Sequence, residues 1–175
     1  MTSVKLAAAS KFPEINVQLI GGESHELGQS SGADRWKLIV VYRGLHCPLC
    51  AKYLAQLEEM ASEFHEAGAD IIAVSGDGQA KAKEQVERGK LSIPLAYGLT
   101  TKQMTDMGLY ISNPRSPEET DQPFPEPGLF VLTPEREIQI VDISNAPFSR
   151  PDLPAILRGL NFVRTNGYPI RGTFK

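Results

Sequence analysis

Two cysteines are the residues of this sequence best suited to do chemistry. Cys47 and Cys50 are the only cysteines in the chain, and Pro48 and Leu49 lie between them. The pair follows the apolar, β-branched run of residues 38–42, which is typical of a strand buried on both faces. The apolar residues after the pair recur at three- and four-residue steps, which is the period of a helix. A Cys-x-x-Cys pair at a strand-to-helix junction indicates dithiol redox chemistry.

The junction predicts different roles for the two thiols. Pro48 suits the first helical position, so Cys47 should lie at or beside the N-cap, where free N–H groups and the helix dipole favour a thiolate. Cys47 is therefore the predicted nucleophile, and Cys50, one turn later on the buried face, the predicted resolving thiol. His46 would favour the thiolate further if it were protonated, although a structural histidine is an equally good explanation of this residue.

Other interpretations of the pair remain open at this stage. The cysteines could be structural, or they could form half of a zinc or iron site that His46 or a second chain completes. One Cys-x-x-Cys provides only two ligands, and the sequence has no second pair. No metal and no other cofactor is predicted.

Composition sets the broad class of the protein. A chain of 175 residues with 41% hydrophobic residues can bury a substantial core in one domain. The net charge of −3 contains no long run of one sign, so neither nucleic acid nor a membrane surface is a predicted partner. The apolar patch at residues 6–9 is too short for a signal peptide, and no run could span a bilayer. We therefore expect a cytoplasmic protein, in which a cysteine pair is more often catalytic than structural.

Hydrophobic periodicity and turn residues predict an alternation of strands and helices. Strands are expected at residues 15–20, 25–27, 36–42, 70–75, 93–97, 128–133 and 137–143. Helices are expected at residues 47–67, 76–89, 102–107 and 152–166.

Several local features add detail to this prediction. Pro94 should place its strand at a sheet edge, and Asp77 should cap the helix that follows it. The proline-rich residues 112–127 are expected to form an insertion over the site. Residues 1–11 are expected to be a loose leader, and residues 169–175 a tail.

This order of elements is that of a thioredoxin-like α/β fold at residues 12–168, in which helices flank a central mixed sheet. It has an N-terminal β extension and a proline-rich insertion before the C-terminal hairpin. The sequence resembles the peroxiredoxin-like branch of the alkyl hydroperoxide reductase and thiol-specific antioxidant family. The resemblance rests on the strand at 36–42, Cys47, the strand at 70–75 and the hairpin that begins at Gly128.

The peroxidase signature of that family is only partly present. Peroxiredoxins carry a threonine or serine three residues before the reactive cysteine, a proline seven residues before it, and an arginine just before the hairpin strand. Gly44, Val40 and Glu126-Pro127 stand at those positions. The missing hydroxyl and guanidinium would orient peroxide and stabilise developing charge. Arg43 or Arg150 could replace them, although ordinary salt bridges explain both residues more simply.

The resemblance also implies a substrate-binding role for Pro127. Thioredoxin-like enzymes carry a cis-proline at this place, which faces the cysteines and binds the backbone of the substrate. A trans proline in an ordinary loop is the alternative. Pro127, Arg43 and His46 are therefore the predicted substrate-binding residues.

Three functional hypotheses follow. The first is a thiol-dependent antioxidant oxidoreductase that cycles Cys47 and Cys50 between dithiol and disulfide and reduces disulfide or peroxide substrates. The second is an atypical peroxiredoxin specific for hydroperoxides, and the third is a redox sensor or metal-binding module without turnover. The enzyme hypotheses require an external reductant, either a thioredoxin-type protein or a small thiol. A homodimer is possible.

Overall fold

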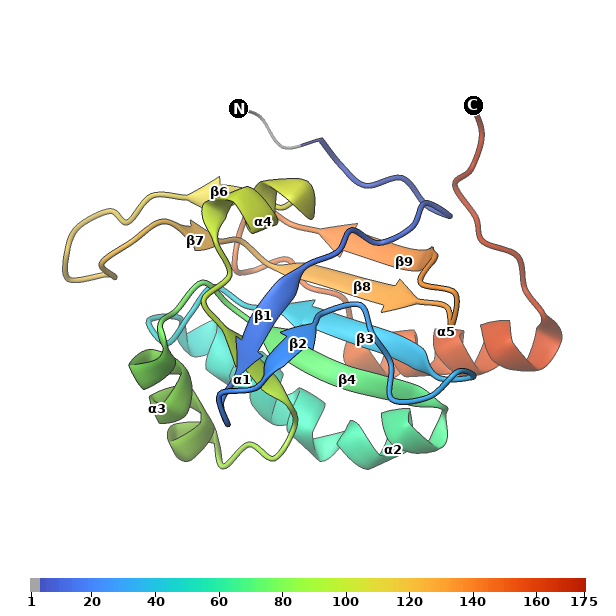
Figure 1. Ribbon diagram of the computed structural model, residues 1–175, viewed down its shortest axis with the longest axis horizontal. Helices are drawn as coiled ribbons and strands as arrows, with labels where there is room; N and C mark the ends of the chain where they lie inside the picture. Colours follow the sequence, from blue (N-terminus) through green and yellow to red (C-terminus); the bar gives the residue numbers. More distant parts are fainter. Residues whose placement is uncertain (1–3) are drawn as a thin grey trace.

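Three adjacent strands form the centre of the molecule. A computed structural model describes residues 4–175 (Figure 1). Strand β3 (Trp36–Val41) pairs in parallel with β4 (Ala69–Val74) and antiparallel with β8 (Gly128–Leu132). These strands are almost continuously apolar because both faces of the sheet are covered. The end of β3 is thereby fixed inside the molecule, and the cysteine motif follows directly from it.

The remaining strands extend the sheet on both sides. The order is β2-β1-β5-β4-β3-β8-β9, with β9 (Ile138–Ile143) at one edge and β2 (Ser24–Glu26) at the other. Strand β5 (Leu95–Tyr97) lies between β4 and β1 (Asn16–Leu19), so the edge position expected for it is wrong. Pro94 precedes the strand, and its carbonyl accepts from the Ala73 N–H at 3.0 Å. A proline can still serve as an acceptor there, since it lacks only the donor.

Helices cover one face of the sheet, and the N-terminal elements cover the other. Helices α1 (Pro48–Glu59), α2 (Ala61–Glu66), α3 (Gln79–Gly89) and α5 (Leu153–Asn166) contribute to one hydrophobic core with alternate residues of β3. The second core joins the opposite face of β3 to β1 and α4 (Thr101–Asp106). Figure 1 shows the β1–β2 hairpin in front of β3 and β4. The expected mixed sheet flanked by helices is present.

The long helix expected after Cys47 is divided in two. Met60 ends α1, and its N–H donates to the Gln56 carbonyl at 3.1 Å. Helix α2 then begins at Ala61 and carries the buried Phe64 into the core. All the helices among the described residues are too short or too polar to cross a membrane.

The proline-rich segment contains a small antiparallel pair. Strand β6 (Ile111–Ser112) pairs with β7 (Phe124–Pro125), and the Glu126 N–H donates to the Tyr110 carbonyl at 2.8 Å. The segment therefore returns to the start of β8 beside the end of β3. This return brings Glu126 into the region of the cysteine motif.

The end of the expected leader, at residues 9–11, is hydrogen-bonded to β9 and the turn before it. The Ala9 N–H donates to the Ile138 carbonyl at 2.9 Å, and the Ile138 N–H donates to the Ser10 carbonyl at 3.0 Å. Phe12 is buried against Phe130, with ring centroids 5.2 Å apart. Hydrogen bonds to the edge strand β9 fix these residues. Sequence periodicity does not predict such contacts. Residues 1–3 of the expected leader lie outside the described residues.

Helix α5 begins at an aspartate cap, and we expect Asp152→Ala to destabilise the fold. Asp152 Oδ2 accepts from the Ala155 N–H at 3.0 Å. Loss of such a cap costs about 1 kcal/mol, which corresponds to a fall in Tm of roughly 2–4 °C for a chain of this size. Thermal unfolding measures this change. Asp34→Ala, at an exposed loop position, is the matched control, and an equal loss of Tm in both variants would contradict the capping role.

Candidate active site

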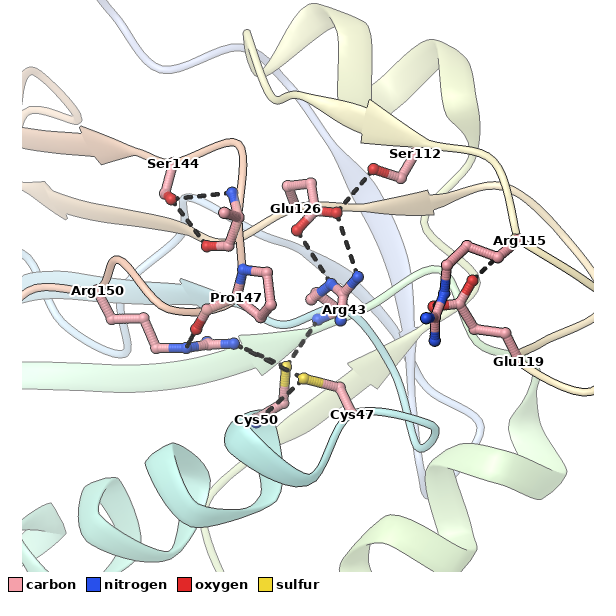
Figure 2. A network of polar contacts seen from close by, with 11 residues as sticks. Arg43, Cys47, Cys50, Ser112, Arg115, Glu119, Glu126, Ser144, Pro147 and Arg150 are labelled. Atoms are coloured by element: carbon pink, nitrogen blue, oxygen red, sulfur yellow. Dashed lines mark hydrogen bonds and ion pairs between the residues drawn. The ribbon is translucent and has the colours of Figure 1, made fainter.

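Cys47 lies at the N-terminus of α1, in the position that the sequence predicts. It is the N-cap residue, with extended backbone angles, and Pro48 occupies the first turn. Cys47 Sγ accepts from the Cys50 N–H at 3.2 Å (Figure 2). The sulfur therefore takes the place of the hydroxyl or carboxylate oxygen of an ordinary N-cap. A negatively charged sulfur gains most from this position.

Both sulfurs are buried and reduced. Cys47 is 2% exposed, Cys50 is 0% exposed, and both are free thiols. Cys50 Sγ accepts from the Arg43 N–H at 3.4 Å. Residues three apart at the start of a helix lie within the Cα separation that a disulfide requires.

The two thiols have opposite pKa shifts. A hydrogen bond from the Cys50 thiol lowers the pKa of Cys47 most, with further contributions from the Cys50 N–H, Arg43 and Arg150, and together these outweigh burial. Burial raises the pKa of Cys50, and the hydrogen bond to Cys47 and the charge on Cys47 raise it further. Cys47 is therefore the thiolate of the pair, and Cys50 remains protonated beside it.

Arg150 supplies a positive charge directly to the sulfurs. It comes from the loop between β9 and α5, and its Nη2 lies 3.0 Å from Cys50 Sγ and 3.8 Å from Cys47 Sγ. Its Nε donates to the Pro147 carbonyl at 2.9 Å, and its guanidinium stacks over the Tyr53 ring. These contacts fix the guanidinium in place. The sequence suggested Arg150 only as one of two possible replacements, because 100 residues separate it from Cys50.

Arg43, one of the predicted substrate-binding residues, lies on the other side of the thiol pair (Figure 2). Its Nε lies 3.0 Å from Glu126 Oε2, and the two side chains are 15% and 4% exposed. The Ser112 hydroxyl donates to Glu126 Oε1 at 2.7 Å, and the Arg43 guanidinium lies over the Phe124 ring. The salt bridge that the sequence suggested for Arg43 is present, but it is largely buried and not on the surface. Glu126 stands where the family carries its arginine, and here it holds Arg43.

Gly44 stands where peroxiredoxins have a threonine or serine. Its φ of +145° is a conformation that side-chain-bearing residues rarely adopt, and an added Cβ would lie 2.8 Å from Asp77 Oδ1. Asp77 is buried, and its Oδ2 accepts from the Leu45 N–H at 2.7 Å. Asp77 is therefore not the cap of α3, whose N-cap is Gly78. Burial raises the pKa of the Asp77 carboxyl.

Two predicted residues differ in one respect each from what the sequence suggested, the protonation of His46 and the peptide bond before Pro127. Burial and the charge of Arg43 lower the pKa of His46, which opposes the protonated form that would assist a thiolate. Its ring packs edge-on against Phe124 with centroids 4.6 Å apart. The bond before Pro127 is trans, since the described residues contain no cis peptide, and the Pro127 carbonyl accepts from the Ser144 N–H. The cis-proline alternative is therefore wrong.

The described residues contain no cluster of three histidine, cysteine or acidic side chains able to hold a metal ion.

The site contains two thiols, two guanidiniums and two buried carboxylates. A thiol pair at the end of the central strand of a mixed sheet defines a protein of the thioredoxin-fold class.

Comparison with known proteins identifies the family within this class. A model described as the AhpC/TSA family matches residues 8–141. The chain belongs to this family, and the resemblance stated above is confirmed. Membership in this family supports the assignment of the protein as a thiol-dependent oxidoreductase with antioxidant function. No curated protein matches the sequence.

Solved structures show the same fold at low sequence identity. A cysteine-to-serine mutant of peroxiredoxin 6 from Arenicola marina matches with a TM-score of 0.79 and 17% identity, covering 93% of this chain and 75% of that one. A peroxiredoxin-like protein from Aquifex aeolicus matches at 0.76 and 16%, covering 91% and 88%. The peroxidoxin BcpB from Mycobacterium tuberculosis matches at 0.72 and 18%, covering 91% and 99%. The thioredoxin-like fold is confirmed.

The pKa of Cys47 can be measured in Cys50→Ser, where it is the only thiol. The serine hydroxyl can donate in place of the Cys50 thiol, and the backbone N–H, Arg43 and Arg150 remain, so the pKa of Cys47 should stay below the value of about 8.5 for a free cysteine. We therefore expect the ultraviolet thiolate absorbance to be present already at pH 7 and to fall as the pH is lowered. The same variant in urea is the control and should titrate near that free value. A native midpoint equal to the urea midpoint would contradict the thiolate assignment.

Gly44→Ala should destabilise the protein. The backbone conformation costs at least about 1–3 kcal/mol for a residue with a side chain, and contact with Asp77 adds to this. Urea unfolding measures the change. Gly159→Ala, within α5 and with nothing within 4 Å of an added Cβ, is the control and should be neutral or stabilising. Equal stability of Gly44→Ala and the natural protein would show that position 44 tolerates the side chain that the family signature requires.

Proposed function

We propose that this protein is a thiol-dependent peroxidase in which Cys47 attacks a hydroperoxide and Cys50 then closes an internal disulfide. The observation that carries this proposal is the Arg150 guanidinium, 3.0 Å and 3.8 Å from the two sulfurs. It supplies a positive charge in place of the family arginine, whose position in this sequence holds Glu126 and Pro127. Arg43, held by Glu126, supplies a second charge beside Cys47.

Burial of the nucleophile favours a small substrate. Cys47 is 2% exposed, and a hydroperoxide needs only a terminal oxygen to reach the sulfur. A protein disulfide would have to align three sulfur atoms in this enclosed space. Disulfide reduction is therefore the second candidate, favoured only by the Cys-x-x-Cys spacing itself.

The first step converts the thiolate to a sulfenic acid. The Cys47 thiolate attacks the terminal oxygen of the hydroperoxide, an S–O bond forms as the O–O bond breaks, and the alkoxide leaves and takes a proton from water. Sulfur is oxidised, and the peroxide is reduced to an alcohol. Arg150 and Arg43 lie where negative charge moves from sulfur to oxygen, so they can stabilise the transition state.

The second step closes the disulfide. Oxidation removes the negative charge of Cys47, and with it one of the effects that raise the pKa of Cys50. Cys50 then loses its proton and attacks Cys47 Sγ, and hydroxide leaves and takes up that proton as water. The thiol with the lowered pKa, Cys47, therefore reacts first with peroxide, and the thiol with the raised pKa, Cys50, reacts second to close the disulfide.

An external thiol must reduce the disulfide. A pocket of about 290 Å³ beside the motif is lined by Leu49 and Phe148, which are 40% and 85% exposed. By the same burial argument a small thiol is the proposed reductant, and a thioredoxin-type protein is the alternative; either would regenerate both thiols by disulfide exchange.

The rate with hydrogen peroxide tests the proposal. We expect reduced protein to react roughly a hundredfold or more faster than free cysteine compared at equal thiolate concentration, since electrostatic stabilisation of this kind contributes that much. Rapid quenching and mass spectrometry should detect a disulfide in the natural protein and a trapped sulfenic acid in Cys50→Ser. A rate equal to that of free cysteine would contradict the peroxidase proposal and leave disulfide reduction.

Arg150→Met should lower this rate roughly a hundredfold, because it removes the charge but keeps an apolar side chain. Arg158→Met, exposed on α5, is the matched control and should react like the natural protein. If Arg150→Met reacts as fast as the control, Arg150 does not replace the family arginine.

A further inference from the structure

A second hollow lies at the end of β3 away from the cysteines. Its volume is about 820 Å³, and its lining comes from the β2 region, the beginnings of β3 and β4, α2 and the segment before β5. Figure 1 shows α2 below the beginning of β4. Of the residues of β4, only Ala73 and Val74 pair with β5, so the first four described residues of β4 have no strand partner on the side away from β3. The hollow occupies the place that a longer β5 would fill.

A buried lysine lines this pocket. Lys37 is 4% exposed, and its Nζ lies 3.3 Å from His25 Nε2. No carboxylate oxygen in residues 4–175 lies within 4 Å of the Lys37 ammonium. The nearby Asp70 is engaged by Arg35 Nε at 2.6 Å and by the Ser31 N–H at 2.5 Å. Lys37 is thus a buried cation with no carboxylate of the described residues at ion-pair distance, although the charges of Asp70 and Glu26 still act on it and oppose the effect of burial on its pKa.

The electrostatics of the pair are consistent with a free donor. Burial lowers the pKa of Lys37 to about 8, so the ammonium form still predominates at pH 7. Burial and the charge of Lys37 lower the pKa of His25, and the unprotonated ring nitrogen of a neutral His25 can accept one hydrogen bond from the ammonium. An ammonium has three donors, so two remain for a ligand.

The pocket has the composition of a small-molecule site. Leu19, Ile71, Ile72, Ile93 and Pro94 form apolar walls, and Glu66 and Asp70 also line the pocket. Arg35 already pairs with the Asp70 carboxylate. A volume of this size with a few polar groups is typical of ligand pockets. A buried charge without a partner is costly, and a ligand anion would offset that cost.

We propose that this pocket binds a small carboxylate with an apolar body. The carboxylate accepts hydrogen bonds from Lys37 Nζ, and the apolar body packs against Ile72 and Ile93. The pocket and the thiol site lie at opposite ends of β3, so this inference does not depend on the peroxidase proposal.

Decanoate, used below its micelle concentration, tests the proposal with the natural protein. We expect saturable binding by calorimetry and amide chemical-shift changes in ¹⁵N-labelled protein at Ser31, Ile71 and Ser92, with none at Cys47. Decanol, which lacks the charge, should bind about tenfold or more weakly, since a hydrogen bond to a charged group contributes that much. Absence of saturable binding, shifts confined to other residues, or equal binding of decanol would overturn the proposal.

Substitution of the lysine provides a second test. Lys37→Met should weaken decanoate binding about tenfold or more, whereas Lys83→Met, on the exposed surface of α3, should leave it unchanged. Unchanged binding in a folded Lys37→Met protein would contradict the role of the ammonium. If that variant does not fold, the comparison of decanoate with decanol in the natural protein still decides.

Discussion

The site depends on the stabilisation of a negatively charged sulfur inside the protein. Removal of a charge from water is costly, and the cost is offset only by donors fixed at the right distance. Cys47 has the Cys50 N–H at 3.2 Å and the Arg150 guanidinium at 3.8 Å. The strand, helix and loop that supply these groups are held by the same core. The reactivity of the sulfur is therefore a property of the whole fold.

The usual peroxiredoxin groups are replaced by different residues in different places. The threonine position is Gly44, and the space beside it is occupied by the Asp77 carboxylate. The arginine position is Glu126, which binds Arg43 instead of a substrate oxygen. Arg150 then brings a guanidinium to the sulfurs from after the hairpin. Positive charge beside the sulfur is retained, although no signature residue other than the cysteine remains.

The buried charges near the two ends of β3 have different surroundings. At its C-terminal end, Cys47 has donors that match its charge. At its N-terminal end, Lys37 is hydrogen-bonded to His25 and has no carboxylate within 4 Å among residues 4–175, and an open pocket lies beside it. The charge on Cys47 is stabilised without a ligand, whereas the Lys37 ammonium has two further donors that a ligand could use. Lys37 lies near the beginning of β3, and Cys47 follows its end.

The sequence by itself determined what neighbouring residues decide: the strand before Cys47, its position at a helix N-terminus, the C-terminal hairpin, and the thioredoxin-like order of elements. These follow from hydrophobic period, proline and capping rules, which act over a few residues. About half of the site could be predicted in this way. Only the tertiary structure decided that Arg150 reaches both sulfurs, that Asp77 binds the Leu45 N–H instead of capping α3, and that β5 lies inside the sheet. The side-chain contacts of Asp77 and Arg150 join residues 32 to 103 positions apart, and no local preference encodes which distant partner a side chain will meet.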